Sequence, residues 1–126
     1  MVQLFTGIDL IKIERIEKSI RSPRFLARVF SAEENAFFAS RGMRAETIAA
    51  SYAAKEAFGK ALGTGIRGFA FKEVAVLRDP LGAPYFALSG NAARIAEERG
   101  LRFSLSLTHT EELAAAFVVA WKEEGR

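Results

Sequence analysis

The chain has no cysteine, only three prolines and a single histidine among its 126 residues. Without cysteine it cannot build a disulfide framework, a thiolate metal site or a cysteine nucleophile, and one histidine cannot form a histidine metal pair. The longest apolar run, residues 113–121, is far shorter than the roughly 20 residues that a membrane-crossing helix needs. The first ten residues include Asp9 and no basic residue, so they do not resemble a secretory signal. These absences predict a cytoplasmic protein without a membrane partner.

What is present is typical of a globular domain. Half of the residues are hydrophobic and 26% are charged, and the net charge is +3. The length predicts one domain over residues 1–126, with a core thin enough to gain from contacts between subunits. The basic isoelectric point, near 9.5, favours an anionic partner without choosing among a nucleic acid, a phosphate ligand and an acidic protein.

Hydrophobic periodicity divides the chain into helices and strands. Strands are expected at residues 4–13, 73–78, 84–88, 102–107 and 113–121, and helices at 13–22, 23–30, 32–41, 46–62 and 91–99. Ser31 and Glu34 form a capping-box pattern, Asn91 is a candidate N-cap, and Gly63 is expected to end the long helix. The last strand is almost entirely apolar, which predicts that both of its faces are covered. This order indicates an α+β fold with a largely antiparallel sheet and a long helix packed on it.

Two carboxylates and a lysine are the strongest candidates for chemistry. Asp9 interrupts an apolar strand, where a lone carboxylate is costly unless it is paired. Glu56 and Lys60 are four residues apart and share a helix face with Tyr52. Asp9 would otherwise be held by backbone amides or an arginine, and Glu56 with Lys60 would be a surface pair worth about 0.2–0.5 kcal/mol. If the two carboxylates meet, they suit Mg²⁺, and a nearby lysine would favour a diphosphate.

The remaining candidates each have a plain structural alternative. His109, at the end of the strand 102–107, would contact a phosphate or a base, or would simply be satisfied by the backbone. Gly63 and Gly65 follow a helix C-terminus, which repels anions, so they stop the helix and do not form a phosphate loop. No serine has the flanking glycines of a nucleophile elbow, which argues against a hydrolase triad.

Cations recur every three or four residues between Lys12 and Arg28. This strip would dock an acidic partner, or it would be a solvated face with the pairs Glu14–Lys18 and Glu17–Arg21. A basic nucleic-acid-binding module is a further alternative, although the interleaved glutamates weaken it. A non-catalytic scaffold is another, but it would not need Asp9, Glu56 and Lys60 together.

Taken in order, four segments resemble one family, the holo-acyl-carrier-protein synthases, which are small bacterial phosphopantetheinyl transferases. The segments are Gly7–Ile16, Ala53–Ile66, Leu81–Pro84 and Ser104–Thr110, and together they extend over essentially the whole chain. The resemblance implies a phosphopantetheinyl transferase-like fold and a homotrimer with its active site between neighbouring subunits. It also implies Mg²⁺-dependent transfer of the 4′-phosphopantetheine group from coenzyme A to a serine of an acyl carrier protein, as in fatty acid biosynthesis.

The resemblance assigns a role to each matching residue. Asp9 and Glu56 would bind Mg²⁺ and act in catalysis with Lys60, which would neutralise the diphosphate. Substrate-binding residues would be Lys55 near the diphosphate, Leu81, Gly82 and Pro84 beside the adenine, and Ser106, Thr108 and His109 at the nucleotide end. The carrier protein would dock on Arg15, Lys18, Arg21, Arg24 and Phe25. One departure stands out: Ser51-Tyr52 replaces the arginine and the Phe or Trp usual in the family, and Arg44 or Arg67 would have to supply the lost cation.

Overall fold

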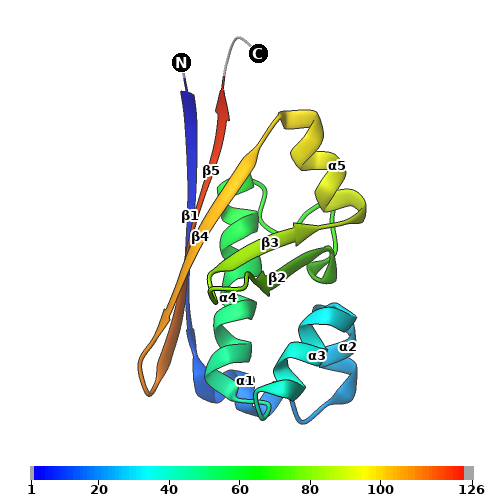
Figure 1. The fold of residues 1–126 in the computed structure, drawn as a ribbon, viewed down its shortest axis with the longest axis vertical. Helices are drawn as coiled ribbons and strands as arrows, with labels where there is room; N and C mark the ends of the chain where they lie inside the picture. The colour runs from blue at the N-terminus through cyan, green and yellow to red at the C-terminus, as the bar shows by residue number, and fades with distance from the viewer. Residues whose placement is uncertain (1, 124–126) are drawn as a thin grey trace.

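The computed structural model describes residues 2–123 and has the α+β architecture that the sequence predicts (Figure 1). Its elements, in chain order, are β1 (Val2–Lys12), α1 (Ile13–Ser19), α2 (Pro23–Val29), α3 (Ala32–Ser40), α4 (Ala45–Leu62), the 3-10 turn η1 (Phe71–Glu73), β2 (Val74–Arg78), β3 (Pro84–Leu88), α5 (Gly90–Arg99), β4 (Arg102–His109) and β5 (Leu113–Glu123). No helix in this part of the chain is long and apolar enough to cross a membrane.

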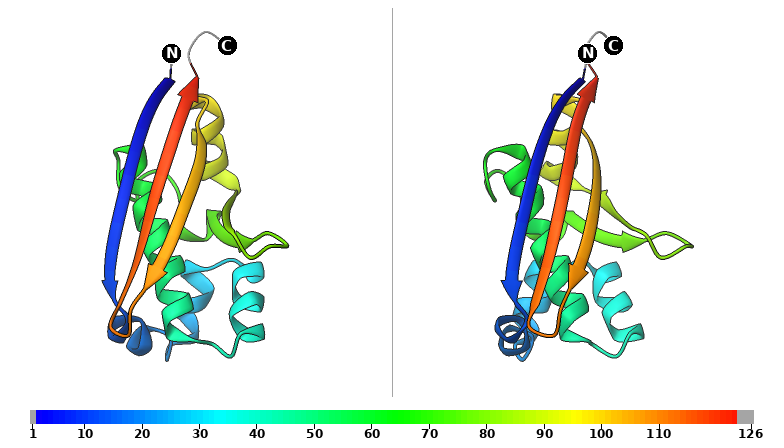
Figure 2. Two further views of the ribbon diagram at one scale, coloured as in Figure 1. Left: turned by 60° about the vertical axis from the view of Figure 1, so that its left-hand side comes forward. Right: turned by 90° about the vertical axis from the view of Figure 1, so that its left-hand side faces the viewer.

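The strands form two antiparallel sheets. A three-stranded sheet has the order β1-β5-β4, and β2 and β3 form a separate hairpin. Figure 2 shows the three long strands side by side, with α4 behind them and the hairpin projecting away from the sheet. A Cβ added at Gly7 of β1 would lie 1.9 Å from the Ala57 carbonyl oxygen, so only glycine lets the strand approach α4 this closely.

One hydrophobic core joins the two sheets around α4. The alanines of this helix, including Ala53, Ala54 and Ala57, are fully buried and let it lie close to the strands. Phe58 is in contact with Phe103 of β4, with ring centroids 4.7 Å apart, and with Phe86 of β3 at 5.3 Å. The aromatic side chains therefore fill the wider space where the hairpin meets the sheet.

Local signals set most helix ends. Ser31 and Glu34 form the predicted capping box, and Gly63 ends α4 in the left-handed conformation, at φ 82°. The prediction that Asn91 caps α5 is wrong, because the helix begins at Gly90 and its N-cap residue is Ser89. The carboxylate of Glu73, from η1, instead accepts a hydrogen bond from the Asn91 amide at 3.2 Å. A side chain distant in sequence thus accepts a hydrogen bond from one of the free backbone amides at the start of this helix.

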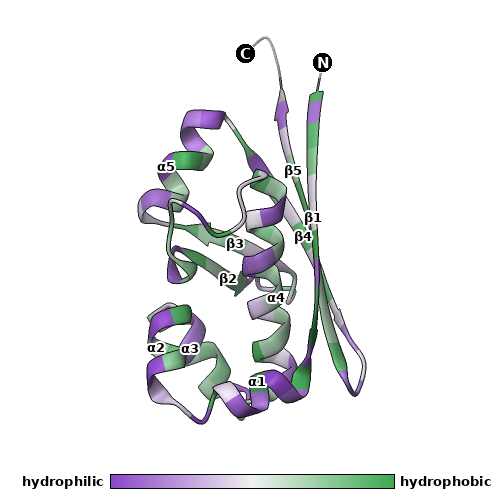
Figure 3. Cartoon of the chain, turned by 180° about the vertical axis from the view of Figure 1, so that it is seen from behind, coloured by the Kyte–Doolittle hydropathy of each residue, from purple (hydrophilic) through white to green (hydrophobic). Residues whose placement is uncertain are grey.

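Residues 2–123 leave the outer face of the three-stranded sheet uncovered. In β5 alternate residues such as Ala114, Ala116 and Val118 are buried against α4, whereas Phe117 on the other face is 44% exposed. The prediction that both faces of β5 are covered is therefore wrong for a single chain. Neighbouring β1 adds further exposed apolar side chains to the outer face, and hydrophobic residues line much of this strand in Figure 3: Leu4, Ile8 and Leu10.

Candidate active site

Asp9 and Lys60 form the first cluster. The Lys60 ammonium donates to the Asp9 carboxylate oxygen Oδ1 at 3.1 Å and to the Ile8 carbonyl oxygen at 2.8 Å. The side chain of Asp9 is 17% exposed and that of Lys60 is 53% exposed, so the pair lies at the protein surface and not in the core. The close packing of Gly7 against α4 sets this geometry, because it brings the strand within reach of the helix.

Glu56 lies on the same part of α4. Two contacts show the direction in which β1 runs along α4. Gly7 of β1 packs against Ala57 and Ala61 of the helix. Arg15, which follows β1 in the chain, has its guanidinium 5.8 Å from the centre of the Tyr52 ring, nearer the start of the helix. Because β1 thus runs toward the N-terminal half of α4, Asp9 comes level with the turn between Glu56 and Lys60. Burial raises the pKa of the Tyr52 phenol, and the negative charges of Glu56 and Asp9 raise it further against the opposing effect of Arg15. Both carboxylates therefore act on one side chain.

This cluster suits a metal ion that keeps most of its ligands outside the protein. Within residues 2–123 no group of three or more His, Cys, Asp or Glu side chains could enclose a metal. Two carboxylates alone fit Mg²⁺, which commonly takes one or two protein carboxylates and completes its octahedron with water and phosphate oxygens. Lys60 adds a fixed positive charge one helical turn from Glu56.

A second cluster lies in a cleft of about 310 Å³ at the N-terminal end of α4. It brings together four residues of the predicted nucleotide site, namely Gly82, Pro84, Thr108 and His109. Leu81 is 95% exposed at the tip of the β2–β3 turn and does not line the cleft. Ser106 is exposed on the outer face of β4, on the same side as Thr108, and also lies outside the cleft lining.

The two clusters do not meet within one chain. Thr47 of the cleft and Glu56 are nine residues apart, so they point to opposite sides of α4 and lie about 13 Å apart along its axis. The strand register also separates the two clusters. Asp9 pairs with Ala116 of β5, and Ala116 pairs on its other side with Leu107 of β4. Asp9 and the cleft strand are therefore two strand spacings apart, about 10 Å.

Lys55 does not reach either cluster, contrary to the role that the resemblance implied. Its ammonium donates to the Glu34 carboxylate at 2.7 Å and to the carbonyl oxygens of Phe71 and Val74, and both charged side chains are fully buried. Burial lowers the pKa of Lys55, and the charge of Glu34 opposes that effect. Lys55 thus ties α3, α4 and β2 together inside the core.

The predicted docking residues lie beside the first cluster. Phe25 of α2 stacks on Tyr52, with ring centroids 6.0 Å apart, one helical turn before Glu56. Arg15 lies over the same ring, and the other cations of the set, Lys18, Arg21 and Arg24, are exposed. Of the two ion pairs expected along this strip, Glu14–Lys18 is present at 3.2 Å. The basic surface therefore adjoins the two carboxylates.

Sequence reasoning missed two arginines at the cleft. Arg41 and Arg78 line a neighbouring cleft of about 380 Å³ together with Arg44, one of the two candidates for the lost cation. Arg67, the other candidate, lines neither cleft, and Ser51 is itself buried. The three arginines come from separate parts of the chain, so no local pattern in the sequence predicts that they lie together. The only local sign of a role for Arg78 was its position directly before the turn Asp79–Gly82.

Comparison with known proteins identifies the family of this chain. The family model described as the 4′-phosphopantetheinyl transferase superfamily matches residues 6–119. The holo-[acyl-carrier-protein] synthase of Clostridium perfringens is 43% identical over 119 residues, with 90% of each chain covered. The crystal structure of the Neisseria meningitidis synthase matches with a TM-score of 0.86 at 37% identity, covering 92% of this chain and 96% of that one.

A second solved structure carries a ligand. The synthase–CoA complex from Chronobacterium ammoniagenes matches with a TM-score of 0.84 at 30% identity, and covers 97% of this chain and 99% of that one. The family match spans the strand of Asp9, the helix of Glu56 and Lys60, and the cleft strand that ends at His109. On these grounds the chain belongs to the 4′-phosphopantetheinyl transferase superfamily.

Proposed function

We propose that this transferase is a holo-acyl-carrier-protein synthase. It takes the 4′-phosphopantetheine group from coenzyme A and attaches it to a serine of an apo acyl carrier protein, and adenosine 3′,5′-bisphosphate leaves. The observation that carries the proposal is the approach of Asp9 to Lys60 one turn from Glu56, inside the segment that matches the family. The relatives' names and the bound coenzyme A of a similar structure support the same substrates.

Asp9 and Glu56 are the residues that would hold Mg²⁺, because both offer hard oxygen ligands and Asp9 is already held against a cation. When bound, the ion would offset negative charge on the diphosphate. Lys60 would donate to the bridging and leaving oxygens as the bond between phosphorus and the nucleotide breaks. The carrier serine oxygen forms the new bond to phosphorus, and its proton passes to Glu56 or to water.

We further propose that the working form is a homotrimer whose active sites lie between neighbouring copies. Two features support this assembly. The two halves of the site lie on β1 and β4, the opposite edge strands of the sheet, and the outer sheet face leaves Leu4, Ile8 and Leu10 more than 60% exposed. A partner copy on this face would bury apolar area and would bring its cleft to the first copy's carboxylates. The cytoplasmic location expected from the sequence stays a prediction.

The test is intact-mass spectrometry of an apo acyl carrier protein after incubation with this protein, coenzyme A and Mg²⁺, with EDTA added to a parallel sample. A mass gain of one phosphopantetheine arm that disappears with EDTA supports both the reaction and the metal. A gain that persists with EDTA contradicts the metal. No gain with several carriers, combined with a gel shift of a nucleic acid at moderate salt, would favour a basic binding module.

A further inference from the structure

Tyr52 connects the basic docking surface with the carboxylate cluster. Its ring stacks on Phe25 of α2, with centroids 6.0 Å apart, and lies 5.6 Å from the Phe71 ring of η1. The Arg15 guanidinium, from α1, lies 5.8 Å from the centre of the same ring. Only 9% of Tyr52 is exposed. Groups from three elements therefore hold the ring, and they fix the direction in which its hydroxyl points.

These contacts account for the ring of Tyr52 but not for its hydroxyl. A phenylalanine would make the same aromatic contacts and would bring no polar group to a nearly buried position. A tyrosine hydroxyl at such a position ordinarily has a hydrogen-bonding partner. The hydroxyl of Tyr52 therefore indicates a polar group close to this ring.

Glu56 is that polar group. It lies four residues after Tyr52 in α4, on the same helix face. Helical side chains lean toward the N-terminus of their helix, so the Glu56 carboxylate leans toward the Tyr52 ring. Burial, the charge of Glu56 and a hydrogen bond with Glu56 all raise the pKa of the Tyr52 phenol. The phenol thus stays protonated and meets the carboxylate as a hydrogen-bond donor.

A single donor of this kind controls how a carboxylate binds a metal. A carboxylate has two oxygens, so a hydroxyl bonded to one of them leaves the other free. Groups that hold a metal-binding side chain from outside fix its orientation and raise the affinity for the metal.

The inference rests on the proposed function, which assigns Mg²⁺ to Asp9 and Glu56. We propose that the Tyr52 hydroxyl donates a hydrogen bond to the Glu56 carboxylate and holds it in the orientation that binds the metal. Tyr52 is a positioning residue in this arrangement, because it acts through Glu56.

The test removes the hydroxyl and keeps the ring. Tyr52→Phe and wild-type protein are titrated with Mn²⁺, and the free ion is measured by electron paramagnetic resonance, so no turnover is needed. Loss of the outer partner should raise the dissociation constant for Mn²⁺ about tenfold. Tyr85→Phe is the matched control, because Tyr85 is the other tyrosine of the chain, is 44% exposed on β3 and lines neither cleft. It should keep the wild-type dissociation constant.

The same substitution in a Glu56→Gln background separates positioning from packing. If the hydroxyl acts through the carboxylate, removing it there should change the dissociation constant for Mn²⁺ by less than about twofold. An equal, about tenfold loss in both backgrounds would mean that Tyr52→Phe disturbs the site through its packing, and would overturn the proposal.

Transfer assays at limiting Mg²⁺ give a second readout. The half-saturating Mg²⁺ concentration of Tyr52→Phe should rise about tenfold, and the KM for the carrier should stay unchanged. A raised carrier KM with an unchanged Mg²⁺ requirement would place the hydroxyl at the docking surface and overturn the positioning role.

The outcomes also separate this proposal from the proposed function. If wild-type protein transfers the arm and Tyr52→Phe keeps the wild-type affinity for Mn²⁺, the reaction stands and the positioning role fails. If wild-type protein transfers no arm to any carrier, the proposed function fails. In that case weaker Mn²⁺ binding by Tyr52→Phe, present with Glu56 and absent with Gln at this position, still supports the hydrogen bond. A wild-type protein that binds no Mn²⁺ overturns the metal assignment and the positioning role together.

Discussion

Glu56 is the residue on which the proposed chemistry depends most directly, because it would share the metal with Asp9 and lies one turn from Lys60. Replacing it by glutamine keeps the size of the side chain and removes its charge. Glu56→Gln should lower kcat by about 10²–10³-fold and change the KM for the carrier little. Steady-state transfer rates at saturating Mg²⁺ measure both constants.

Glu97→Gln is the control, since Glu97 is exposed on α5 and lies in neither cleft. It should transfer at the wild-type rate. A Glu56→Gln variant with a near-normal rate would show that the metal assignment is wrong.

Lys55 carries a stability prediction and not a catalytic one. Lys55→Met leaves the Glu34 carboxylate charged and without its cation in the core, which should cost about 3–5 kcal/mol of unfolding free energy. Adding Glu34→Gln removes the stranded charge and should restore part of the loss. Urea unfolding measures these differences. Lys18→Met, at an exposed ion pair, should change stability by less than about 1 kcal/mol, and an equally small effect of Lys55→Met would contradict the buried pair.

Sequence patterns could predict the first cluster but not the surroundings of Lys55. The spacing of Glu56 and Lys60 fixes a shared helix face, and an acidic residue inside an apolar strand marks Asp9. The depth of Lys55 depends on Glu34, 21 residues away, and on two carbonyl groups of η1 and β2. Local periodicity gives the direction of a side chain, and only the packing of distant elements decides whether it meets water.

At the level of elements, the α1–α2 surface is expected to recognise the carrier. The exposed cations of these helices, including Arg15 and Arg24, adjoin the carboxylate cluster through Tyr52 and Phe25. Arg15→Glu with Arg24→Glu should raise the KM for an acidic carrier about tenfold or more and flatten its dependence on salt, because long-range attraction is lost. The kcat should change much less than the KM.

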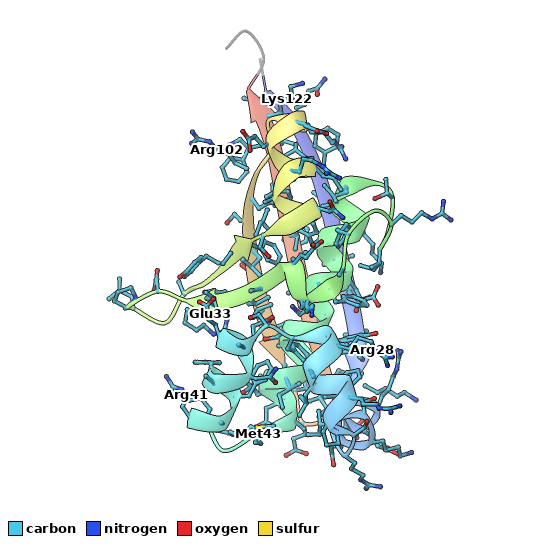
Figure 4. The ribbon with its side chains drawn as sticks, turned by 90° about the vertical axis from the view of Figure 1, so that its right-hand side faces the viewer. Arg28, Glu33, Arg41, Met43, Arg102 and Lys122 are labelled. Atoms are coloured by element: carbon cyan, nitrogen blue, oxygen red, sulfur yellow. The ribbon has the colours of Figure 1, made fainter. Side chains whose placement is uncertain are left out.

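Transfer kinetics over a range of ionic strengths measure this effect. Arg102→Glu is the control, because Arg102 is exposed on β4 and Figure 4 places it at the far end of the molecule from Arg28 of α2. An unchanged KM in the double variant would rule out these helices as the docking surface.

The elements themselves were predicted well where the signal was local. The capping box at Ser31 and the glycine stop at Gly63 depend only on neighbouring residues, and both are present. Asn91 failed because Glu73, from another segment, satisfies the start of α5. The prediction that this chain covers both faces of β5 failed for a different reason. An apolar run indicates that both faces of a strand avoid water, but it does not say which molecule covers each face.

For the whole molecule, the open outer face and the divided site lead to the same expectation. Phe117, 44% exposed, and Ile8, 63% exposed, occupy opposed positions on this face. A chain of this size has a thin core, so covering this apolar surface with a partner copy would add to its stability. Because the carboxylates and the cleft lie at opposite edge strands of the sheet, a trimer in which each site takes its halves from two neighbours would account for both features.

This arrangement predicts that two inactive variants restore each other. Glu56→Gln removes the carboxylate half, and His109→Ala removes part of the cleft half, so each should be nearly inactive alone. In mixed trimers, a site that takes Glu56 from the His109→Ala chain and His109 from the Glu56→Gln chain is intact. Every mixed trimer has two copies of one variant and one of the other, so about a third of the sites in the purified mixed species are of this kind. Co-expression with two different tags, purification of the mixed species and a transfer assay would measure the recovered activity. Recovery near that fraction requires a site shared between chains, whereas a mixture as inactive as its components would mean that each chain builds its own site.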